Sequence, residues 1–211
     1  IVARFLEEGA NVTIVDFDKT AALAYMESLK SDRVHFEYAD LADGKSVAEL
    51  FDRLQTRWSR LDVLVNNAGT THLPALLEDV SEKDFDKVFA VNAKSVYYTS
   101  KFAVPWMKQQ AAGAIVNIAS TAALSPRPHL TWYNASKGWM VTATKSMAIE
   151  LASERIRVNA ICPVAGETPL LASFMGSDTP ETREKFLSSI PLGRFSTPKD
   201  IAATALYLAS D

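Results

Sequence analysis

Short apolar segments rich in β-branched residues alternate with longer segments of helical periodicity along the chain. The apolar segments lie at residues 11–16, 33–40, 61–67, 114–119 and 156–161, and their length and composition predict buried parallel strands. The helical segments lie at residues 1–9, 17–30, 44–59, 81–110, 133–153, 179–188 and 198–209, and an irregular stretch separates residue 161 from residue 179. This alternation predicts an α/β fold in which helices cover both faces of a doubly wound parallel sheet.

Composition narrows the class of protein. The 211 residues are 48% hydrophobic and 22% charged, which suits one folded domain over residues 1–211. The formal net charge of −3 gives no electrostatic basis for binding nucleic acid or an anionic membrane. No apolar segment is long enough to cross a bilayer. The single cysteine, Cys162, excludes an internal disulfide and a cysteine-based zinc site. We therefore expect no metal and a cytoplasmic location.

A serine, a tyrosine and a lysine follow the fourth apolar segment in an order that suits proton transfer. Ser120 comes directly after the predicted strand, at the edge where parallel sheets bind ligands. Tyr133 opens the next predicted helix and Lys137 follows one turn later, which places the phenol beside the ammonium group. A nearby cation lowers the pKa of a phenol, and the Ser120 hydroxyl can donate a hydrogen bond to a substrate oxygen. The set suits carbonyl reduction or alcohol oxidation, with the hydride moved by a separate cofactor.

The spacing Tyr-x-x-x-Lys is a weak pattern by itself, because the chain contains a second example at Tyr97 and Lys101. That pair lies inside a predicted helix, follows no strand, and has Asp84 where the first pair has a serine. We interpret the second pair as helix surface or interface.

Several predicted strands end in polar or small residues that suit a dinucleotide. Asp16 can accept hydrogen bonds from both ribose hydroxyls and would repel a 2′-phosphate, which favours NAD(H) over NADP(H); a helix N-cap at Asp16 or Asp18 is the alternative. Asp40 ends the next strand, where it could bond an adenine amino group or form a turn. Gly69 follows the third strand and lets the backbone approach a ligand. Asn92 is a poor helix former in mid-helix, so it could bind a backbone carbonyl or water.

Taken together, these residues resemble the signature of the classical short-chain dehydrogenase/reductase family. The matching positions run in the family's order along nearly the whole chain: NNAG at 66–69, Asn92, Ser120, Tyr133 and Lys137. The joint match is highly specific, unlike each of its parts. It implies a Rossmann-type fold and an NAD(H)-dependent oxidoreductase that interconverts an alcohol and a ketone or aldehyde.

The resemblance also implies roles for single residues. Ser120 would stabilise the substrate oxygen and Tyr133 would be the general acid/base, while Lys137 would bind the nicotinamide ribose and lower the tyrosine pKa. Asn92 would hold a water in a proton relay. The remaining cofactor-binding positions are Asp16, Asp40, Leu41, Asn67, Ala68, Gly69, Pro163 and Thr168. The helices that carry Tyr97 and Tyr133 pair across a two-fold axis in the family, which implies a homodimer or homotetramer.

Two departures from the family pattern stand out. The family's first strand with its glycine-rich phosphate loop, and its last strand, have no counterpart between residues 1 and 211, so we expect the sheet to lack a central strand. We attribute function to the complete protein, because these residues alone would lack the loop that holds the pyrophosphate. Val164 stands where the family usually has glycine after proline, next to the nicotinamide end of the cofactor.

The loops after the strands are expected to form the substrate side, at Thr70–His72, Thr121–Trp132 and Val164–Met175. Four residues between Ser120 and Tyr133 predict an apolar wall, and two more come from a lid: Pro126, Pro128, Leu130, Trp132, Phe174 and Met175. Such a wall suits a small apolar, cyclic or aryl alcohol, with a 3-oxoacyl thioester or a sugar as further options. His72 and His129 could touch substrate, although a solvated loop histidine is the commoner case. Cys162 is expected to be a small packing residue.

Two other classes of function compete with the oxidoreductase. A non-catalytic sensor or subunit could bind NAD, but it would need no proton donor beside the nicotinamide. Epimerases and dehydratases of nucleotide sugars in this family usually carry a separate substrate domain, for which the chain has no room.

Overall fold

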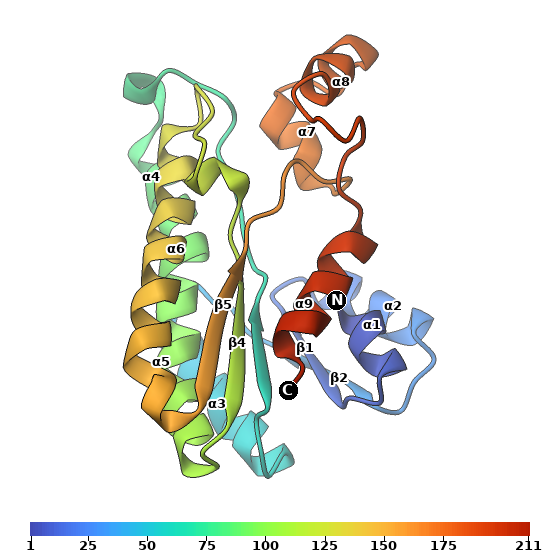
Figure 1. The fold of residues 1–211 in the computed structure, drawn as a ribbon, viewed down its shortest axis with the longest axis vertical. Coiled ribbons are helices and arrows are strands. Elements are labelled where there is room, and N and C mark those ends of the chain that lie inside the picture. The colour runs from blue at the N-terminus through green and yellow to red at the C-terminus, as the bar shows by residue number, and fades with distance from the viewer.

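The structure is a computed structural model that describes all of residues 1–211. Strands and helices alternate along the chain as the sequence predicts (Figure 1). The strands are β1 Val12–Asp16, β2 Val34–Tyr38, β3 Val63–Asn66, β4 Gly113–Ile118 and β5 Ile156–Ile161. The helices are α1 Val2–Glu7, α2 Lys19–Ser28, α3 Gly44–Arg57, α4 Glu82–Phe89, α5 Ser95–Gln109, α6 Thr131–Leu151, α7 Leu170–Met175, α8 Pro180–Leu187 and α9 Pro198–Ala209.

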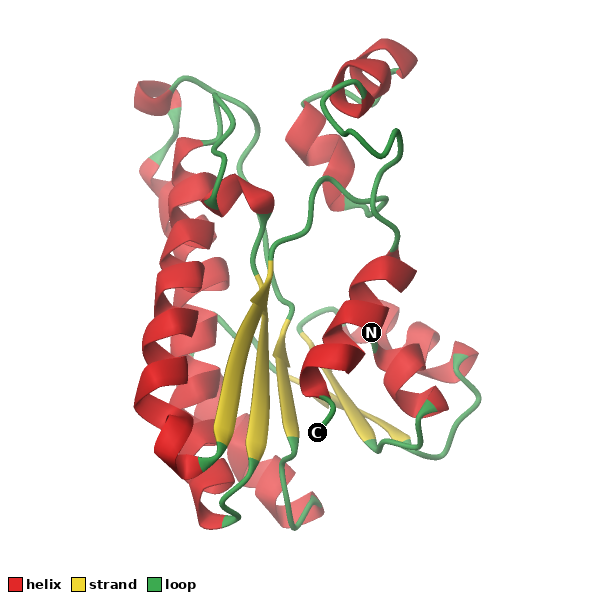
Figure 2. Cartoon of the chain, viewed as in Figure 1, coloured by secondary structure: helices red, strands yellow, loops and turns green.

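All strand pairs are parallel, and they form two sheets (Figure 2). β1 pairs with β2, from Val12 opposite Val34 to Asp16 opposite Tyr38. The second sheet has the order β3-β4-β5. β1 and β3 do not pair, which agrees with the expected loss of a central strand. The α/β architecture is therefore confirmed, with two parallel sheets in place of one continuous ladder.

Helices cover both faces of the larger sheet (Figure 1). α5 and α6 lie on one face, where Met107, Ile115 and Ile156 form a buried cluster. α1 and α9 lie on the other face, where Val116 and Ala205 are fully buried. None of the helices combines the length and the apolar composition that crossing a bilayer requires.

One core cluster joins the two sheets. α3 supplies most of its buried residues, and α5 adds Ala103 and Trp106. Val15 of β1 and Leu64 of β3 both pack against this cluster. The apolar face of α3 thus holds the two sheets together, although no backbone hydrogen bonds connect them.

Two segments differ in detail from the predicted elements. The long helix predicted over residues 81–110 begins at Ser81, which caps α4 as expected, but a π-helical turn at Ala90–Lys94 separates α4 from α5. The stretch predicted to be irregular contains α7, a helix too short for its periodicity to be recognised.

Candidate active site

The carboxyl end of β4 and the first two turns of α6 bring Ser120, Tyr133 and Lys137 to one place. Ser120 follows β4 by two residues and caps a short 3₁₀ turn by accepting a hydrogen bond from the Ala122 N–H at 3.1 Å. Lys137 Nζ donates to the carbonyl oxygen of Ile118 at 2.8 Å. This bond ties α6 to the end of β4, so the helix cannot slide along the strand without breaking it.

A cavity of about 610 Å³ opens above the ends of β3, β4 and β5. Ser120, Tyr133 and Lys137 all contribute to its wall, and so do Asn67 and Gly69 at the end of β3. No Asp or Glu side chain lines it. The three residues proposed for proton transfer therefore share one cavity with small residues that leave room for a ligand.

Burial raises the pKa of the Tyr133 phenol above its ordinary value, and the neighbouring Ser120 hydroxyl acts in the opposite direction. Tyr133 is 4% exposed and its ring packs edge-on against Phe174, with ring centroids 4.9 Å apart. The sequence predicted a pKa lowered by Lys137. That prediction is wrong for the free chain, because desolvation outweighs any effect of the lysine, and the phenol stays protonated at neutral pH.

Burial also lowers the pKa of Lys137, to about 8. The side chain is 4% exposed and has no carboxylate partner, so the charged form loses more hydration than it recovers from the Ile118 carbonyl. A smaller contribution from the nearby Cys162 opposes the shift. Lys137 is thus a cation at pH 7 that releases its proton about one pH unit higher.

Asn92 lies in the π-helical turn and is fully buried. Its amide accepts a hydrogen bond from the Thr70 N–H at 2.8 Å and donates to the Thr70 carbonyl at 2.9 Å. A third bond, from Nδ2 to Ser136 Oγ at 2.9 Å, reaches α6. The predicted contact with a backbone carbonyl is confirmed, and it fixes the loop after β3 against the helix that carries Tyr133.

Gly69 lies between these groups. A Cβ atom added there would lie 3.4 Å from Lys137 Nζ and 3.6 Å from Asn92 Oδ1. The missing side chain leaves a small polar space into which both the ammonium group and an amide oxygen face. Any larger residue at this position would fill that space.

The cofactor positions predicted from the sequence fall into two groups. Asn67, Gly69, Pro163 and Thr168 line the cavity together with Tyr133 and Lys137. Four others lie outside its wall: Asp16, Asp40, Leu41 and Ala68.

Asp16 is exposed at the end of β1, where one carboxylate oxygen accepts the Asp18 N–H at 2.9 Å. Asp18, not Asp16, is the N-cap of α2, so the second oxygen of Asp16 remains free. Asp40 accepts the Ala42 N–H at 2.9 Å, as the turn alternative predicted.

The apolar wall predicted between Ser120 and Tyr133 is only partly correct. Leu130 lines the cavity, whereas Pro126, Pro128 and Trp132 lie outside it. Trp132 instead packs edge-on against Phe85 of α4, with ring centroids 5.3 Å apart. Neighbouring side chains of this loop and of the start of α6 face different sides, which composition alone does not reveal.

The lid prediction is correct for Phe174, which lines the cavity, while Met175 packs inside the lid itself. Neither histidine lines the cavity. His72 is 6% exposed, so the expected solvated state is wrong for this residue, whereas His129 is exposed. Cys162 packs against a buried cluster that includes Met140, as predicted.

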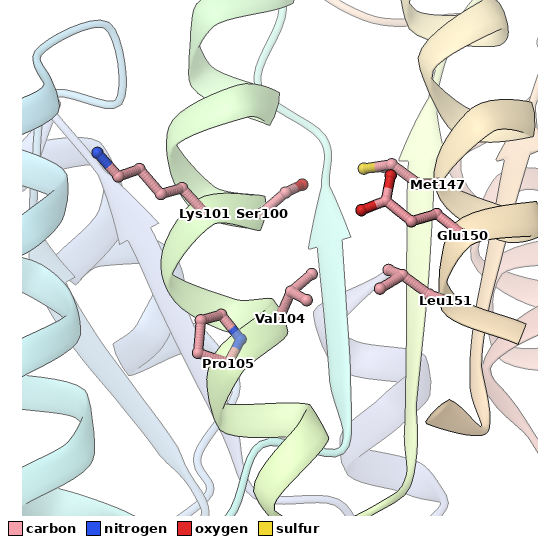
Figure 3. Close-up of a pocket in the computed structure, with 7 residues that line it drawn as sticks. All are labelled: Ser100, Lys101, Val104, Pro105, Met147, Glu150 and Leu151. Atoms are coloured by element: carbon pink, nitrogen blue, oxygen red, sulfur yellow. The ribbon is translucent and has the colours of Figure 1, made fainter. Parts of the chain in front are cut away.

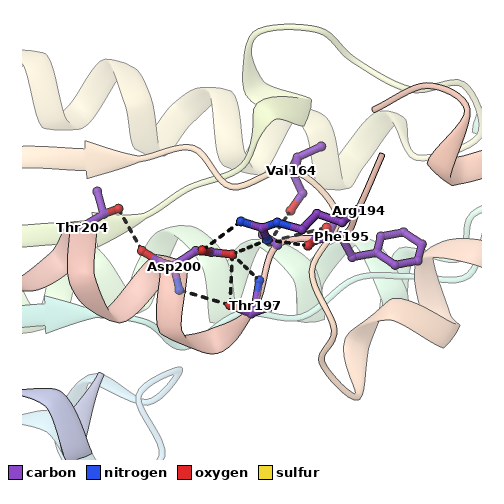
Figure 4. A network of polar contacts seen from close by, with 8 residues as sticks. Val164, Arg194, Phe195, Thr197, Asp200 and Thr204 are labelled. Carbon is purple, nitrogen blue, oxygen red and sulfur yellow. Dashed lines mark hydrogen bonds and ion pairs between the residues drawn. The ribbon is translucent and has the colours of Figure 1, made fainter. Parts of the chain in front are cut away.

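The lid comprises residues 167–195, and its two ends lie side by side. At its base Gly166 and Ser196 form a single parallel bridge, in which the Ser196 N–H donates to the Ala165 carbonyl at 3.1 Å. Near the end of the lid, the Arg194 guanidinium donates two hydrogen bonds to the Asp200 carboxylate of α9, at 2.7 and 3.2 Å (Figure 4). These contacts hold the pKa of the Asp200 carboxyl well below its usual range. Both ends of the lid are thus fixed to the body of the protein.

No individual role was predicted from the sequence for Arg127 or Phe186, although Arg127 lies in a loop that was expected to form part of the substrate side. Arg127 lies between the two prolines of the loop before α6, and Phe186 lies on α8. The guanidinium carbon of Arg127 is 4.6 Å from the ring centroid of Phe186. An arginine inside an otherwise apolar loop was the available signal.

Comparisons with known proteins identify the family. Residues 1–211 match the family described as enoyl-(acyl carrier protein) reductase. A 4-formylbenzenesulfonate dehydrogenase of Comamonas testosteroni is 52% identical over 154 residues, which are 72% of this chain and 60% of that protein. A 3-oxoacyl-(acyl-carrier-protein) reductase of Thermotoga maritima is 39% identical over 98% of this chain and 83% of that protein.

Solved structures agree with these matches. A 3-ketoacyl-(acyl-carrier-protein) reductase from Brucella melitensis complexed with NADH superposes with a TM-score of 0.92 at 41% identity, covering 99% of this chain and 84% of that one. An NAD⁺-bound xylitol dehydrogenase gives a TM-score of 0.90 at 26% identity, covering 99% and 86%. The chain belongs to the classical short-chain dehydrogenase/reductase family of oxidoreductases, with a Rossmann-type fold.

Proposed function

We propose that the protein is an NAD(H)-dependent oxidoreductase that interconverts an alcohol and a ketone or aldehyde, with Tyr133 as general acid/base. The observation that carries this proposal is the presence of Ser120, Tyr133 and Lys137 in the wall of one cavity. When bound, the nicotinamide cofactor supplies or accepts the hydride. The residues of this chain bind and orient the substrate oxygen and move the proton.

In the reducing direction, the protonated Tyr133 phenol donates its proton to the substrate oxygen while the Ser120 hydroxyl hydrogen-bonds the same oxygen. The raised pKa of Tyr133 suits this acid role. In the oxidising direction the phenol must first lose its proton, so we expect alcohol oxidation to accelerate as the pH rises.

After the phenol has donated its proton to the substrate, the ammonium group of Lys137 returns a proton to the Tyr133 phenolate, and the lysine regains its proton from solvent water. Its pKa of about 8 leaves it protonated at pH 7 and makes it a stronger acid than an ordinary lysine. Gly69 leaves a space that borders both Lys137 Nζ and Asn92 Oδ1, which suits the relay proposed for Asn92. The side-chain amide of Asn92 already holds Thr70, so Asn92 also positions the loop that forms this space.

The cofactor fits the residues that are present. Gly69 has no side chain to obstruct the cavity wall, and no carboxylate lines the cavity to repel the phosphates. We propose NAD(H) over NADP(H), because the free oxygen of Asp16 can accept a ribose hydroxyl and its charge repels a 2′-phosphate. Asn67, Pro163 and Thr168 would contact the nicotinamide half, while Asp40, Leu41 and Ala68 would belong to the adenine side and the adjoining wall.

The substrate that we propose is a small apolar, cyclic or aryl alcohol or the corresponding carbonyl compound. Leu130, Val164 and Phe174 make the wall beside Tyr133 largely apolar, and apolar walls with a few polar groups are typical of small-molecule sites. The Comamonas relative is named for an aryl aldehyde, which agrees with this class. A 3-oxoacyl thioester, as in the Thermotoga relative, or a sugar is the second option.

Turnover by the full-length protein tests this function. Alcohols of the aryl, cyclic and aliphatic classes and glucose are incubated with NAD or NADP, and formation of the reduced cofactor is measured. We expect Tyr133→Phe to lower kcat by a factor of about 10²–10⁴ without changing cofactor affinity. Tyr97→Phe, at the second Tyr-x-x-x-Lys pair, is the matched control. NAD binding without turnover of any alcohol would favour a non-catalytic sensor or subunit instead.

A second experiment tests the cofactor preference. Asp16→Ala removes the carboxylate, so we expect the ratio of kcat/KM for NAD to that for NADP to fall by about 10-fold or more. Asp32→Ala removes the same charge from an exposed position after α2 and should leave the ratio unchanged. A wild-type preference for NADP would contradict the assignment.

We also propose a homodimer or homotetramer assembled through α5 and α6. A groove between these helices is lined by residues of both (Figure 3), namely Ser100, Lys101, Val104, Pro105, Met147, Glu150 and Leu151. Tyr97 and Ile149 on the same helices are 52% and 81% exposed. Light scattering of the full-length protein would measure its mass, and a monomer would contradict the proposal.

A further inference from the structure

One wall of the active-site cavity carries an unpaired cation. Arg127 and Lys137 are its only Lys or Arg side chains, and no acidic side chain faces them. Lys137 is occupied by the Ile118 carbonyl. Arg127 lies between Ser120 and Tyr133 in the sequence, in the loop that leads into α6. The cavity is therefore electropositive, although the chain as a whole has a formal net charge of −3.

The guanidinium of Arg127 has no acceptor in the structure. No carboxylate lies within 4.0 Å of it, and its side chain makes no hydrogen bond. Five other arginines each contact a carboxylate: Arg4, Arg53, Arg60, Arg183 and Arg194. Arg57 and Arg155 also make no side-chain hydrogen bond or ion pair, but neither lines the cavity, so Arg127 is the free guanidinium group on its wall.

Two contacts hold Arg127 in place. The guanidinium carbon lies 4.6 Å from the ring centroid of Phe186 on α8, a geometry that orients the planar group while its N–H edge stays available. The main-chain carbonyl of Arg127 accepts a hydrogen bond from Asn134 Nδ2 at 2.8 Å. Because Asn134 directly follows Tyr133, the position of the cation is linked to that of the proton donor.

We infer that Arg127 binds an oxyanion of the substrate, a carboxylate or a sulfonate carried at the end remote from the reacting carbonyl or alcohol. This inference rests on the proposed function and narrows its substrate class to anionic aryl or short-chain compounds. The fork of N–H groups matches two oxygens of such an anion. The apolar wall formed by Leu130 and Phe174 lies in the same cavity and suits the ring or chain between the two ends.

The expected contribution is large, because a partly buried arginine left without its anion is poorly hydrated. Charge-assisted hydrogen bonds in such sites change kcat/KM by about 10- to 100-fold. The effect should appear mainly in KM, since Arg127 contacts the end of the substrate that does not react.

The test compares 4-(hydroxymethyl)benzoate and 4-(hydroxymethyl)benzenesulfonate with neutral 4-methylbenzyl alcohol, using the full-length protein and NAD. We expect wild-type kcat/KM to favour at least one anion by about 10- to 100-fold. Arg127→Gln should remove that preference with little effect on the neutral alcohol, and Arg127→Lys should keep part of it. Lys185→Gln removes an exposed charge next to Phe186 and should keep all of it.

Several results would overturn the inference. The wild type could lack any preference for the anions, or Arg127→Gln could retain it. An Arg127→Gln variant that raises KM for NAD equally with all three alcohols would assign the cation to the cofactor. Calorimetric binding of 4-(hydroxymethyl)benzoate to the NADH complex decides the question even if no alcohol is turned over. Binding that Arg127→Gln abolishes would then support the anion site while the proposed redox function fails, and no binding would refute both.

Discussion

The ammonium group of Lys137 is buried beside a carbonyl oxygen and without a carboxylate, which explains its low pKa. The folded-state pKa of about 8 lies below the ordinary value of 10.5. Folding therefore favours the neutral lysine, and the folded state gains stability as the pH rises from about 8 to 10.5. Below pH 8 both states hold the proton, so that contribution is absent.

This linkage predicts a pH-dependent difference between the wild type and Lys137→Met. The free energy of unfolding of the wild type, relative to that of the variant, should increase by on the order of 3 kcal/mol between pH 7.5 and 10.5. Urea denaturation at several pH values measures it. Lys145→Met, an exposed lysine on the same helix, should show no such change. A flat difference for Lys137→Met would mean that Lys137 keeps its proton when buried.

At the residue scale, the sequence predicted which residues form the site better than it predicted how they are buried. Ser120, Tyr133 and Lys137 were found because their chemistry depends on order and spacing, which a linear sequence contains. The direction of the Tyr133 pKa shift depends on how completely neighbouring elements exclude water, and Phe174 and Leu130 come from parts of the chain whose packing the sequence does not specify. The same limit explains why the sequence placed the loop of Arg127 on the substrate side but gave the arginine no role of its own.

At the element scale, the π-helical turn between α4 and α5 is the least regular feature and holds Asn92. Such turns insert an extra residue into a helix and occur often at functional sites. Here the turn directs a buried amide at both backbone polar groups of Thr70. Neither group has a helical or strand partner, so the asparagine substitutes for secondary structure at this point.

Removing that amide has a predictable cost. Asn92→Ala leaves the Thr70 N–H and carbonyl without partners, so we expect the free energy of unfolding to fall by about 1–3 kcal/mol. Turnover should also fall, because Gly69 and Lys137 lose their spacing. Chemical denaturation and steady-state kinetics measure the two effects. Asn11→Ala, at an exposed asparagine, should change stability by less than about 0.5 kcal/mol, and an equally small effect of Asn92→Ala would refute the role given to this turn.

Most helices and strands were predictable, because their hydrophobic periodicity and their capping residues lie within the element itself or directly beside it in the sequence. Ser81 caps α4 as its position before Glu82 suggested, and β4 and β5 lie within one residue of their predicted bounds. The π-helical turn was not predicted, because the side-chain bonds that Asn92 makes there are with Thr70 and Ser136, which are distant in the sequence. The short helix α7 was missed for a similar reason, since Leu171 and Met175 are buried by contacts with Ile190 and Phe195.

At the scale of the whole molecule, the two sheets depend on the cluster around α3. Leu50 is 2% exposed and lies in the cluster against which Val15 of β1 and Leu64 of β3 both pack. We expect Leu50→Ala to cost about 2–5 kcal/mol of unfolding free energy. Leu192→Ala, at a residue that is 81% exposed, is the matched control.

The number of unfolding transitions shows whether the two sheets unfold together. Thermal unfolding of Leu50→Ala, followed by circular dichroism and by calorimetry, should remain one transition at a lower temperature. Two separate transitions in the wild type would contradict the linking role of this cluster.

The lid begins and ends at neighbouring points, since Gly166 and Ser196 are bridged at its base. Such a segment can serve as a cassette, that is, a stretch of sequence that is exchanged as a unit. Because its ends are bridged to each other, insertions or deletions within it should not alter the spacing of β5 and α9. The lid residues Phe174 and Phe186 of the cavity wall are therefore encoded apart from Tyr133, whereas Arg127 and Leu130 lie in the loop before α6. Genes of this kind could diversify their substrates by recombination within the cassette and inherit the chemistry of Tyr133 unchanged.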